Sequence, residues 1–302
     1  MKRYKVIVGI FTFLLLYAAG GIYNWGRDTV SLNQENIILV FPVISDIHIG
    51  GIMAEVKFEE TLRDLKSLYK GYDALAIVGD VVDTSRKINY NSFNRILKKY
   101  TEYEMNILIS MGNHEYYEGG LTDKEYEDRF KEKLGLKNLY YDKWIKGFHF
   151  IVLAPEHRES AKLSHEQLRW LETKLRENHH GKPMFIFLHQ PFENTVFGSV
   201  GVGIENEDEL YSILNEYPEA IFFSGHSHYD LSDKGNIYNN GSFTMINTGA
   251  LHYILGEGEK RKPFYKTQGL IVEVYNSKVI VRRREFLIHR WIEEPYIIQT
   301  FH

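Results

Sequence analysis

The sequence contains no cysteine among its 302 residues. Disulfides, thiolate nucleophiles and cysteine-ligated zinc are therefore excluded, and any metal ion must be bound by histidine, aspartate, glutamate, asparagine or water. A large excess of either charge is also missing, because 36 lysine and arginine residues face 40 aspartate and glutamate residues. This balance gives no broad attraction to nucleic acid or to an anionic membrane surface, and the sequence carries no nucleic-acid-binding signature.

The N-terminus carries an uncharged stretch, VIVGIFTFLLLYAAGGIY over residues 6–23, which follows a short basic segment. Eighteen such residues are just long enough to cross a bilayer as a helix, and the basic flank would remain in the cytoplasm. We predict a signal anchor or transmembrane segment over residues 1–30, so that the rest of the chain lies outside the cytoplasm at the cell membrane. Residues 18–20 also resemble the cleavage site of a removable signal peptide, so a secreted protein is the alternative. An inverted, intracellular membrane-associated topology is a further alternative.

Short apolar runs alternate with amphipathic stretches beyond the N-terminus, which predicts one α/β domain over residues 37–290 and a C-terminal tail over residues 291–302. The predicted strands are 37–45, 74–79, 106–112, 148–154, 184–190, 220–225, 243–249, 269–275 and 278–286. The predicted helices are marked by Phe58, Leu62, Leu65 and Leu68, by Phe93, Ile96, Leu97 and Tyr100, and by the ranges 122–135 and 207–216. A further helix begins with a Ser164 and Gln167 capping box.

Polar side chains follow five of the predicted strands. They are Asp46 and His48; Asp80 and Asp83; Asn113, His114 and Glu115; His189; and His226 and His228. Ligand sites in α/β sheets lie beyond the carboxyl ends of the strands, so we expect these residues to meet in space. Residues two apart in an extended segment point to the same side, so His226 and His228 are also expected to converge.

The expected cluster contains more metal ligands than one ion can use. The candidates are Asp46, His48, Asp80, Asn113, His189, His226 and His228. One carboxylate shared between two metal ions would complete two sites. Two metal ions about 3.5–4 Å apart are a known arrangement for catalysing in-line displacement at phosphate esters. Carboxylate and imidazole suit manganese, iron and zinc alike, so the metal stays open.

This set of motifs resembles the calcineurin-like metallophosphoesterases, in their bacterial branch of membrane-anchored or exported enzymes. The family pattern D-x-H, GD-x-x-D, GNH-E, a lone H and GH-x-H is matched in order within residues 46–228. The resemblance implies a four-layer αββα sandwich that holds two metal ions. It implies that one ion is bound by Asp46, His48, Asp80 and His228, and the other by Asp80, Asn113, His189 and His226, with Asp80 as the bridge.

The same resemblance implies the reaction, which is hydrolysis of a phosphate mono- or diester by a metal-activated hydroxide. His114 matches the family's general acid and Asp83 the carboxylate that orients it. Protein Ser/Thr phosphatases of the superfamily carry an arginine where Thr84 stands here, and Arg86 is out of register. The alternatives are a non-catalytic binding protein on the same fold and a lipid or nucleotide pyrophosphatase. The oligomeric state stays open.

Two features lie outside the motifs. His252 follows a predicted strand and is a candidate for the edge of the pocket. The basic run over residues 259–263 would either attract a phosphate-rich polymer or serve as solvated surface.

Overall fold

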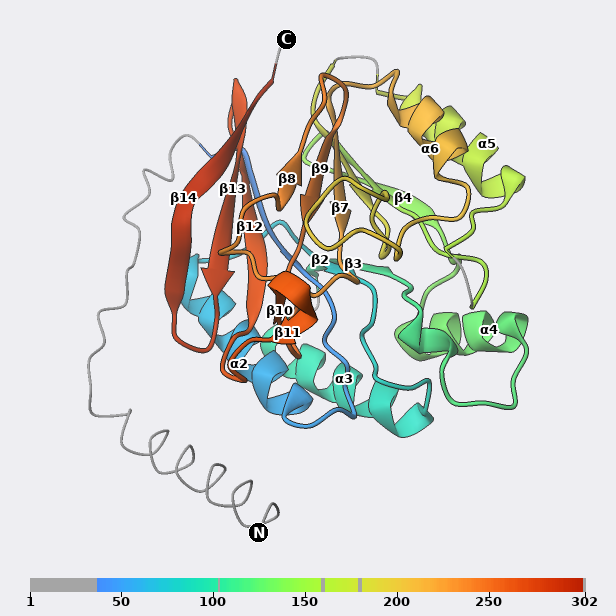
Figure 1. Cartoon of the computed structure of the whole chain (residues 1–302), viewed down its shortest axis with the longest axis vertical. Coiled ribbons are helices and arrows are strands. Elements are labelled where there is room, and N and C mark those ends of the chain that lie inside the picture. The colour runs from blue at the N-terminus through green and yellow to red at the C-terminus, as the bar shows by residue number, and fades with distance from the viewer. Residues whose placement is uncertain (1–36, 103, 159–160, 179–180, 301–302) are drawn as a thin grey trace. The chain divides into compact units, whose positions relative to one another are not determined.

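The computed structural model describes residues 37–302 apart from 103, 159–160, 179–180 and 301–302. The predicted anchor over residues 1–30 lies outside these described residues. Within them, no helix has the length and apolar character needed to span a membrane. Two sheets, each of six strands, dominate the described part of the chain (Figure 1).

The first sheet has the strand order β14-β13-β12-β1-β2-β3. Strands β1, β2 and β3 are parallel, and the strands beyond β1 are antiparallel to their neighbours. Their bounds are β1 Leu39–Ile44, β2 Ala74–Val78, β3 Asn106–Ser110, β12 Gln268–Val274, β13 Lys278–Glu285 and β14 Arg290–Gln299. The parallel part of the sheet therefore carries the first three polar motifs at its carboxyl end.

The second sheet has the order β4-β5-β6-β7-β9-β8. Strands β5, β6, β7 and β9 are parallel, and β4 and β8 are antiparallel edge strands. The bounds are β4 Tyr141–Ile145, β5 Phe148–Val152, β6 Met184–Phe187, β7 Ala220–Ser224, β8 Ile237–Tyr238 and β9 Thr244–Asn247. A separate hairpin is formed by β10 Leu255–Gly256 and β11 Lys260–Arg261.

The two sheets pack face to face through an apolar core. Side chains in a strand alternate between faces, so Leu39, Phe41 and Val43 of β1 enter the inter-sheet core while Ile44 faces the other way. The ring of Phe41 meets the rings of Phe150 and Phe185 on the opposite sheet, with centroids 4.9 and 4.8 Å apart. Burying each such ring stabilises the fold by about 1.5–3 kcal/mol.

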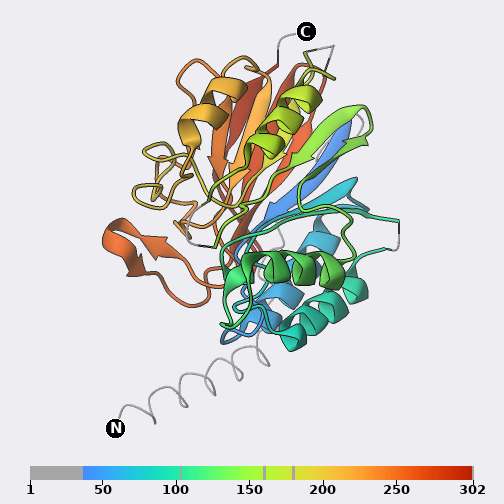
Figure 2. The same ribbon diagram turned by 90° about the vertical axis from the view of Figure 1, so that its right-hand side faces the viewer.

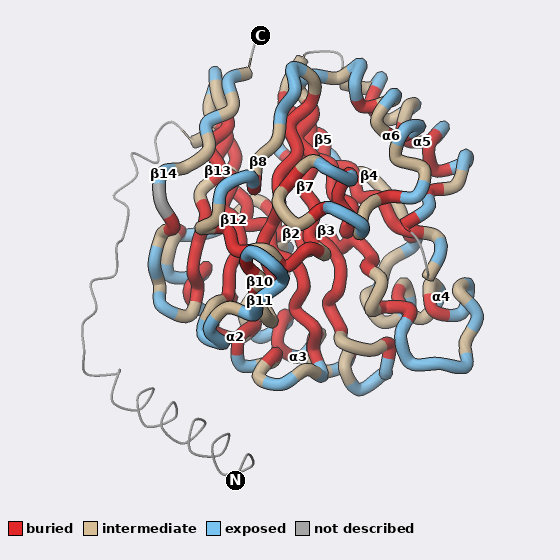
Figure 3. Tube along the Cα trace, viewed as in Figure 1, coloured by how far each residue is buried: buried red, intermediate tan, exposed pale blue. Residues whose placement is uncertain are grey.

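Helices cover the outer face of each sheet (Figure 2). Helices α2 Ala54–Leu68 and α3 Lys87–Tyr100 pack on the first sheet, and α4 Asp123–Leu134 lies beside α3. Helices α5 His165–Leu175 and α6 Glu207–Leu214 pack on the second sheet, and two 3-10 turns are η2 His114–Tyr116 and η3 Glu257–Glu259. The central strands are buried on both faces, whereas edge strands such as β4 and β14 are partly exposed and the helices expose their outer sides (Figure 3). This arrangement confirms the predicted αββα layers.

Two local predictions need correction. At α5, the Ser164 hydroxyl accepts from the Gln167 backbone N–H at 3.1 Å, but the Gln167 side chain bonds to the backbone of Ala154 instead of closing a capping box. The segment over residues 291–299 is not a tail, because β14 pairs with β13 along its length. Pro295 weakens the strand signal in this segment, and a proline is tolerated at the edge position that β14 occupies.

Candidate metal centre

Every predicted ligand follows the carboxyl end of a parallel strand. Asp46 and His48 come after β1, Asp80 after β2, Asn113 after β3, His189 after β6, and His226 and His228 after β7. Their ligand atoms form two groups in which all atoms lie within 4.8 Å of one another, namely Asp46, His48, Asp80 and His228, and Asp80, His189 and His226. Asp80 belongs to both groups, and each sheet supplies part of each group.

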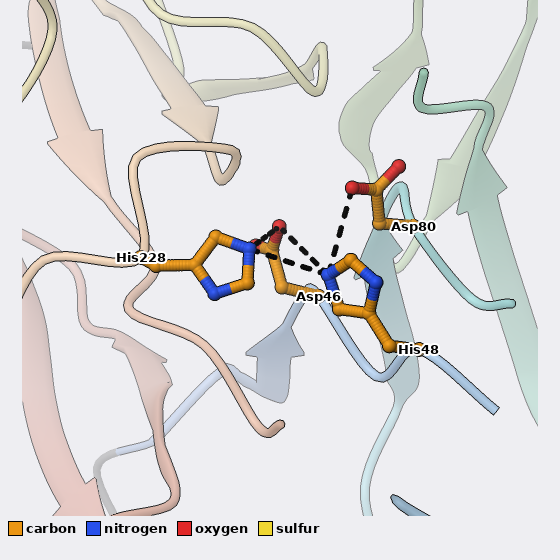
Figure 4. A group of neighbouring side chains, drawn as sticks. All are labelled: Asp46, His48, Asp80 and His228. Carbon is orange, nitrogen blue, oxygen red and sulfur yellow. Dashed lines mark hydrogen bonds and ion pairs between the residues drawn. The ribbon is translucent and has the colours of Figure 1, made fainter. Parts of the chain in front are cut away.

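The first group converges on one point (Figure 4). The Nε2 atom of His48 lies 3.9 Å from Asp46 Oδ1 and 3.7 Å from Asp80 Oδ2. The Nε2 atom of His228 lies 3.1 Å from Asp46 Oδ1 and 3.2 Å from His48 Nε2. All four side chains are almost completely buried. Two carboxylates and two imidazoles therefore share a small volume that is screened from bulk water.

The second group shares the Asp80 carboxylate. The Nε2 atom of His189 lies 3.1 Å from Asp80 Oδ2, and the His189 and His226 ring centroids are 5.0 Å apart. Asn113 lies beside this second group, because the backbone N–H of the next residue, His114, donates to Asp80 Oδ1 at 2.9 Å. The Oδ1 atom of Asn113 is buried and accepts no hydrogen bond from the described residues. An amide oxygen in that condition is available to a cation.

The tautomers of the histidines make both groups fit for metal ions. The Nδ1 atoms of His228 and His189 lie 2.9 and 2.8 Å from backbone carbonyl oxygens, which can only accept, so each Nδ1 carries a proton. In a neutral ring Nε2 then presents a lone pair. That lone pair faces Asp46 Oδ1 in one case and Asp80 Oδ2 in the other, both at 3.1 Å. Two acceptors at this distance repel unless a cation or a proton lies between them.

The pKa values show how strongly the centre favours positive charge. Burial disfavours the charged form of His189, yet the carboxylates of Asp80 and Asp46 raise the pKa of His189 to about 10. Burial also opposes the charge of Asp46, but His228 and His189 hold its pKa at about 2. For His226, burial and the neighbouring His189 lower the pKa to about 4, so this ring is neutral. A bound cation would take the place of the proton, since ligand imidazoles bind metal in their neutral form.

The ligand-bearing loops are strained. The residues with a left-handed backbone include Asp46 with φ 53°, His48 with φ 51°, Asp80 with φ 51°, His226 with φ 65° and His228 with φ 57°. Each such position costs roughly 1–2 kcal/mol for a residue with a side chain. Strain of this kind persists where the surrounding fold fixes the backbone and is concentrated at functional sites.

The left-handed positions overturn the expected geometry of the SGHSH segment. His226 and His228 lie in a bend instead of an extended strand, so the same-side argument is wrong. Their rings reach different groups, because His226 lies 5.0 Å from His189 and His228 lies 5.1 Å from His48 between ring centroids. The bend therefore directs one imidazole to each half of the centre.

Two motif glycines give the ligands room to approach. A Cβ atom on Gly112 would stand 2.2 Å from Asp80 Oδ1, and one on Gly225 would stand 2.5 Å from Asp46 Oδ2. Real side chains do not tolerate such contacts. The glycines before Asn113 and His226 are thus explained by close packing against a carboxylate.

His114 and Asp83 lie at the rim of the centre, with a contact that differs from the predicted one. The Nδ1 atom of His114 donates to the backbone carbonyl oxygen of Asp83 at 2.8 Å. The Asp83 carboxylate is 3.9 Å from that nitrogen and 3.5 Å from Nδ1 of His48. The carbonyl group, and not the carboxylate, therefore fixes the His114 ring. About a quarter of the His114 side chain is exposed, so its Nε2 is left for a partner outside the protein.

Glu115 has a role that sequence reasoning did not assign. Its buried carboxylate accepts backbone hydrogen bonds from Asp80 at 3.1 Å, Val82 at 3.2 Å and Gly112 at 2.6 Å. Burial, followed by the charge of Asp80, raises the pKa of Glu115 to about 8. Glu115 thereby links the loops after β2 and β3. The sequence signal that could have indicated this role was the position of Glu115 in the GNHE motif.

His252 lies at the edge of the centre, where the sequence made it a candidate. Its ligand atom forms a third group with those of His48 and Asp83. Its Nε2 lies 3.2 Å from the carbonyl oxygen of Ile52, and its buried Nδ1 has no hydrogen-bond partner among the described residues. His252 thus extends the polar surface of the first group toward solvent.

In a fourth group of acidic and histidine side chains, a lysine balances the negative charge. Asp142, His149 and Glu177 lie together on β4, β5 and the residues after α5. Lys174 reaches Asp142 at 3.2 Å and Glu177 at 3.0 Å, so an ammonium group already balances these carboxylates. No lysine or arginine lies within ion-pair distance of Asp46 or Asp80 among the described residues.

Known proteins resemble this chain in sequence and in fold. Purple acid phosphatase 22 of Arabidopsis thaliana is 26% identical over 254 residues, which cover 80% of this chain and 56% of that protein. The structure of a purple acid phosphatase from yellow lupin (Lupinus luteus) seeds matches with a TM-score of 0.63 at 13% identity, covering 86% of this chain and 53% of that one. The chain thus spans about half the length of these relatives. The family model for calcineurin-like phosphoesterases matches residues 39–230, and the chain therefore belongs to the calcineurin-like phosphoesterase family.

Proposed function

We propose that the protein is a two-metal phosphoesterase that hydrolyses phosphate mono- or diesters. The observation that carries this proposal is the shared Asp80 carboxylate, which belongs to two groups of ligand atoms whose carboxylates pair with no lysine or arginine among the described residues. One ion would be held by Asp46, His48, Asp80 and His228, and the other by Asp80, Asn113, His189 and His226. Two such ions would acidify a water molecule to hydroxide near neutral pH and neutralise the charge of the phosphate oxygens.

His114 is the proposed general acid. The bond from its Nδ1 to the Asp83 carbonyl leaves Nε2 as the atom that gives a proton to the leaving oxygen. The Asp83 carboxylate lies 3.9 Å from Nδ1 of His114, so its negative charge faces the proposed proton donor. Asp83 therefore acts on the proton donor and not on the phosphate.

The substrate class is proposed to be phosphate esters, with lipid or nucleotide pyrophosphate as the alternative. The names of the two relatives describe them as phosphatases, which favours an ester. Thr84 stands where protein Ser/Thr phosphatases carry arginine, which argues against phosphoprotein substrates. A binding protein without catalysis is disfavoured because no member of either ligand group is replaced.

We further propose that the protein acts outside the cytoplasm, held at the cell membrane by residues 6–23. The support is the uncharged length of this segment and its basic flank. A secreted form after cleavage is the alternative.

A substrate panel on the metal-loaded full-length chain tests the catalytic proposal. Manganese, iron and zinc are each supplied, the metal content is measured, and aryl phosphate mono- and diesters, cyclic nucleotides, nucleoside monophosphates, lipid diphosphates and wall-polymer phosphodiesters are offered. The proposal expects two metal ions per chain and turnover of at least one ester. Two bound ions with no turnover of any substrate would favour the binding protein instead, and turnover of diphosphates alone would favour the pyrophosphatase.

A further inference from the structure

The β10–β11 hairpin is attached directly to the segment that carries His228. The Leu255 backbone N–H donates to the His228 carbonyl oxygen at 2.8 Å, and the Asp230 N–H donates to the Leu255 carbonyl oxygen at 2.9 Å. The hairpin, orange in Figure 2, extends away from the two sheets. Its base is therefore fixed beside the metal centre while its sides face solvent.

An aromatic ring links this hairpin to the centre. Tyr253 stacks on His228 with ring centroids 3.9 Å apart and an interplanar angle of 19°. The guanidinium carbon of Arg261 lies 4.4 Å from the centroid of the Tyr253 ring. Arg261 is thus separated from a proposed metal ligand by a single stacked ring.

The charge of Arg261 contacts the Tyr253 ring and is not balanced by a carboxylate among the described residues. Among the described residues, no carboxylate lies within ion-pair distance of Arg261, whose side chain is exposed. The neighbouring cations differ, because Lys262 lies 3.4 Å from Asp233 and Lys266 pairs with Asp230 at 2.5 Å. Those two lysines hold the hairpin in place, and Arg261 remains available.

The geometry also suits a guanidinium better than an ammonium. A guanidinium that stacks flat on an aromatic face keeps its N–H edge free, and that edge binds phosphate through two parallel hydrogen bonds. The contact with Tyr253 restrains the side chain, so less conformational entropy is lost when an anion binds. Lys260, the preceding residue in β11, is expected to point to the opposite face of the strand.

We propose that Arg261 is a specificity-determining residue that binds a second anionic group of the substrate, adjacent to the phosphate that is hydrolysed. This inference rests on the proposed function, and it narrows the substrate class to phosphoesters with a further phosphate or carboxylate nearby, such as oligophosphates and polymers of phosphodiesters. Simple monoesters would lack the contact with Arg261.

Calorimetric binding of phosphonates to the manganese-loaded full-length chain tests the proposal. Diphosphonates with one to three carbons between the phosphonates are compared with monophosphonates of matching length. For at least one diphosphonate, we expect Arg261→Ala to weaken binding about tenfold while monophosphonate binding changes less than twofold. Arg261→Lys should retain part of the affinity. Lys260→Ala is the control, because it removes one positive charge from the same strand, and it should bind both classes of phosphonate as the unchanged protein does.

An equal loss for both classes of phosphonate, or an equal effect of Lys260→Ala, would overturn the proposal. The first result would mean that Arg261 supports the centre generally, and the second that only net charge matters. Because the binding measurement needs no turnover, a chain that binds diphosphonates through Arg261 but hydrolyses nothing would disprove the catalytic proposal, while Arg261 would still be shown to bind the second anionic group of a ligand.

Discussion

The Nε2 atoms of His48 and His228 lie 3.2 Å apart, although 180 positions separate the two residues in the sequence. His48 follows a strand of the first sheet and His228 follows a strand of the second. The centre therefore exists only when both sheets are packed together through their shared core. Asp80 belongs to both ligand groups.

Replacing Asp80 with asparagine tests the shared ligand. The amide can still accept from the His114 N–H and can donate to His189 Nε2, so we expect the variant to fold. It lacks the charge that two ions would share, so we expect metal content to fall at both sites and turnover to be lost. Elemental analysis and aryl ester hydrolysis measure the two effects. Asp142→Asn, which changes the carboxylate cluster balanced by Lys174, is the control. Two metal ions per chain with normal turnover would rule out the bridging role.

The role of His114 is separable from metal binding. His114→Ala removes the proposed proton donor and no ligand, so we expect unchanged metal content and turnover lowered about 10²–10⁴-fold. The loss should be greatest for alkyl esters, whose leaving oxygen needs a proton most, and smallest for activated aryl esters. His165→Ala, at an exposed histidine at the start of α5, should have no effect. Equal losses for both ester types would exclude the general acid assignment.

Glu285 gives the fold a dependence on pH that is independent of the metal centre. Its carboxylate lies buried in β13, and burial raises its pKa to about 7 from an ordinary 4.5, although backbone and side-chain N–H groups donate to it. The folded protein therefore binds an extra proton between these pH values, so its free energy of unfolding falls as the pH rises toward 7.

Glu285→Gln should remove this dependence. Between pH 5 and pH 7, we expect the free energy of unfolding of the variant to gain about 2 kcal/mol relative to that of the unchanged chain. Urea unfolding at the two pH values measures the difference, and Glu132→Gln, at an exposed glutamate of α4, should show none. A constant difference at both pH values would mean that the pKa of Glu285 is not raised.

The sequence predicted those parts of the molecule that leave a local signal. Strand β7 is buried on both faces and reads as the continuous apolar run AIFFS, and helix α4 ends at Gly135 in the left-handed conformation with φ 69°. The convergence of the proposed ligand residues was predictable because the carboxyl ends of parallel strands meet at one edge, whatever the details of their loops.

The rest depends on contacts that have no local signature. The Gln167 side chain forms hydrogen bonds with the backbone of Ala154 because β5 ends beside α5. This contact depends on the tertiary structure and not on the local sequence. Glu115 acts through three backbone N–H groups contributed by two loops. The position of Arg261 over the Tyr253 ring arises from the pairing of β10 with β11, two strands too short for a sequence pattern to mark.

Residues 6–23 are proposed to determine the location of the protein. These residues are uncharged, about one bilayer long and preceded by basic residues, so we expect the mature chain to begin near Met1 and to stay with membranes through high-salt washing. Removing residues 1–30 should release a soluble and active enzyme, because every proposed ligand lies at or beyond Asp46.

A reporter fused after residue 30 should be detected outside the cytoplasm, and an intracellular signal would indicate the inverted topology. The small residues at 18–20 are followed by GIYNW, a segment with apolar and aromatic residues that is a poor context for cleavage. N-terminal sequencing distinguishes the outcomes, since a chain that starts near Gly21 would be a secreted enzyme and would refute the anchor without affecting the metal centre.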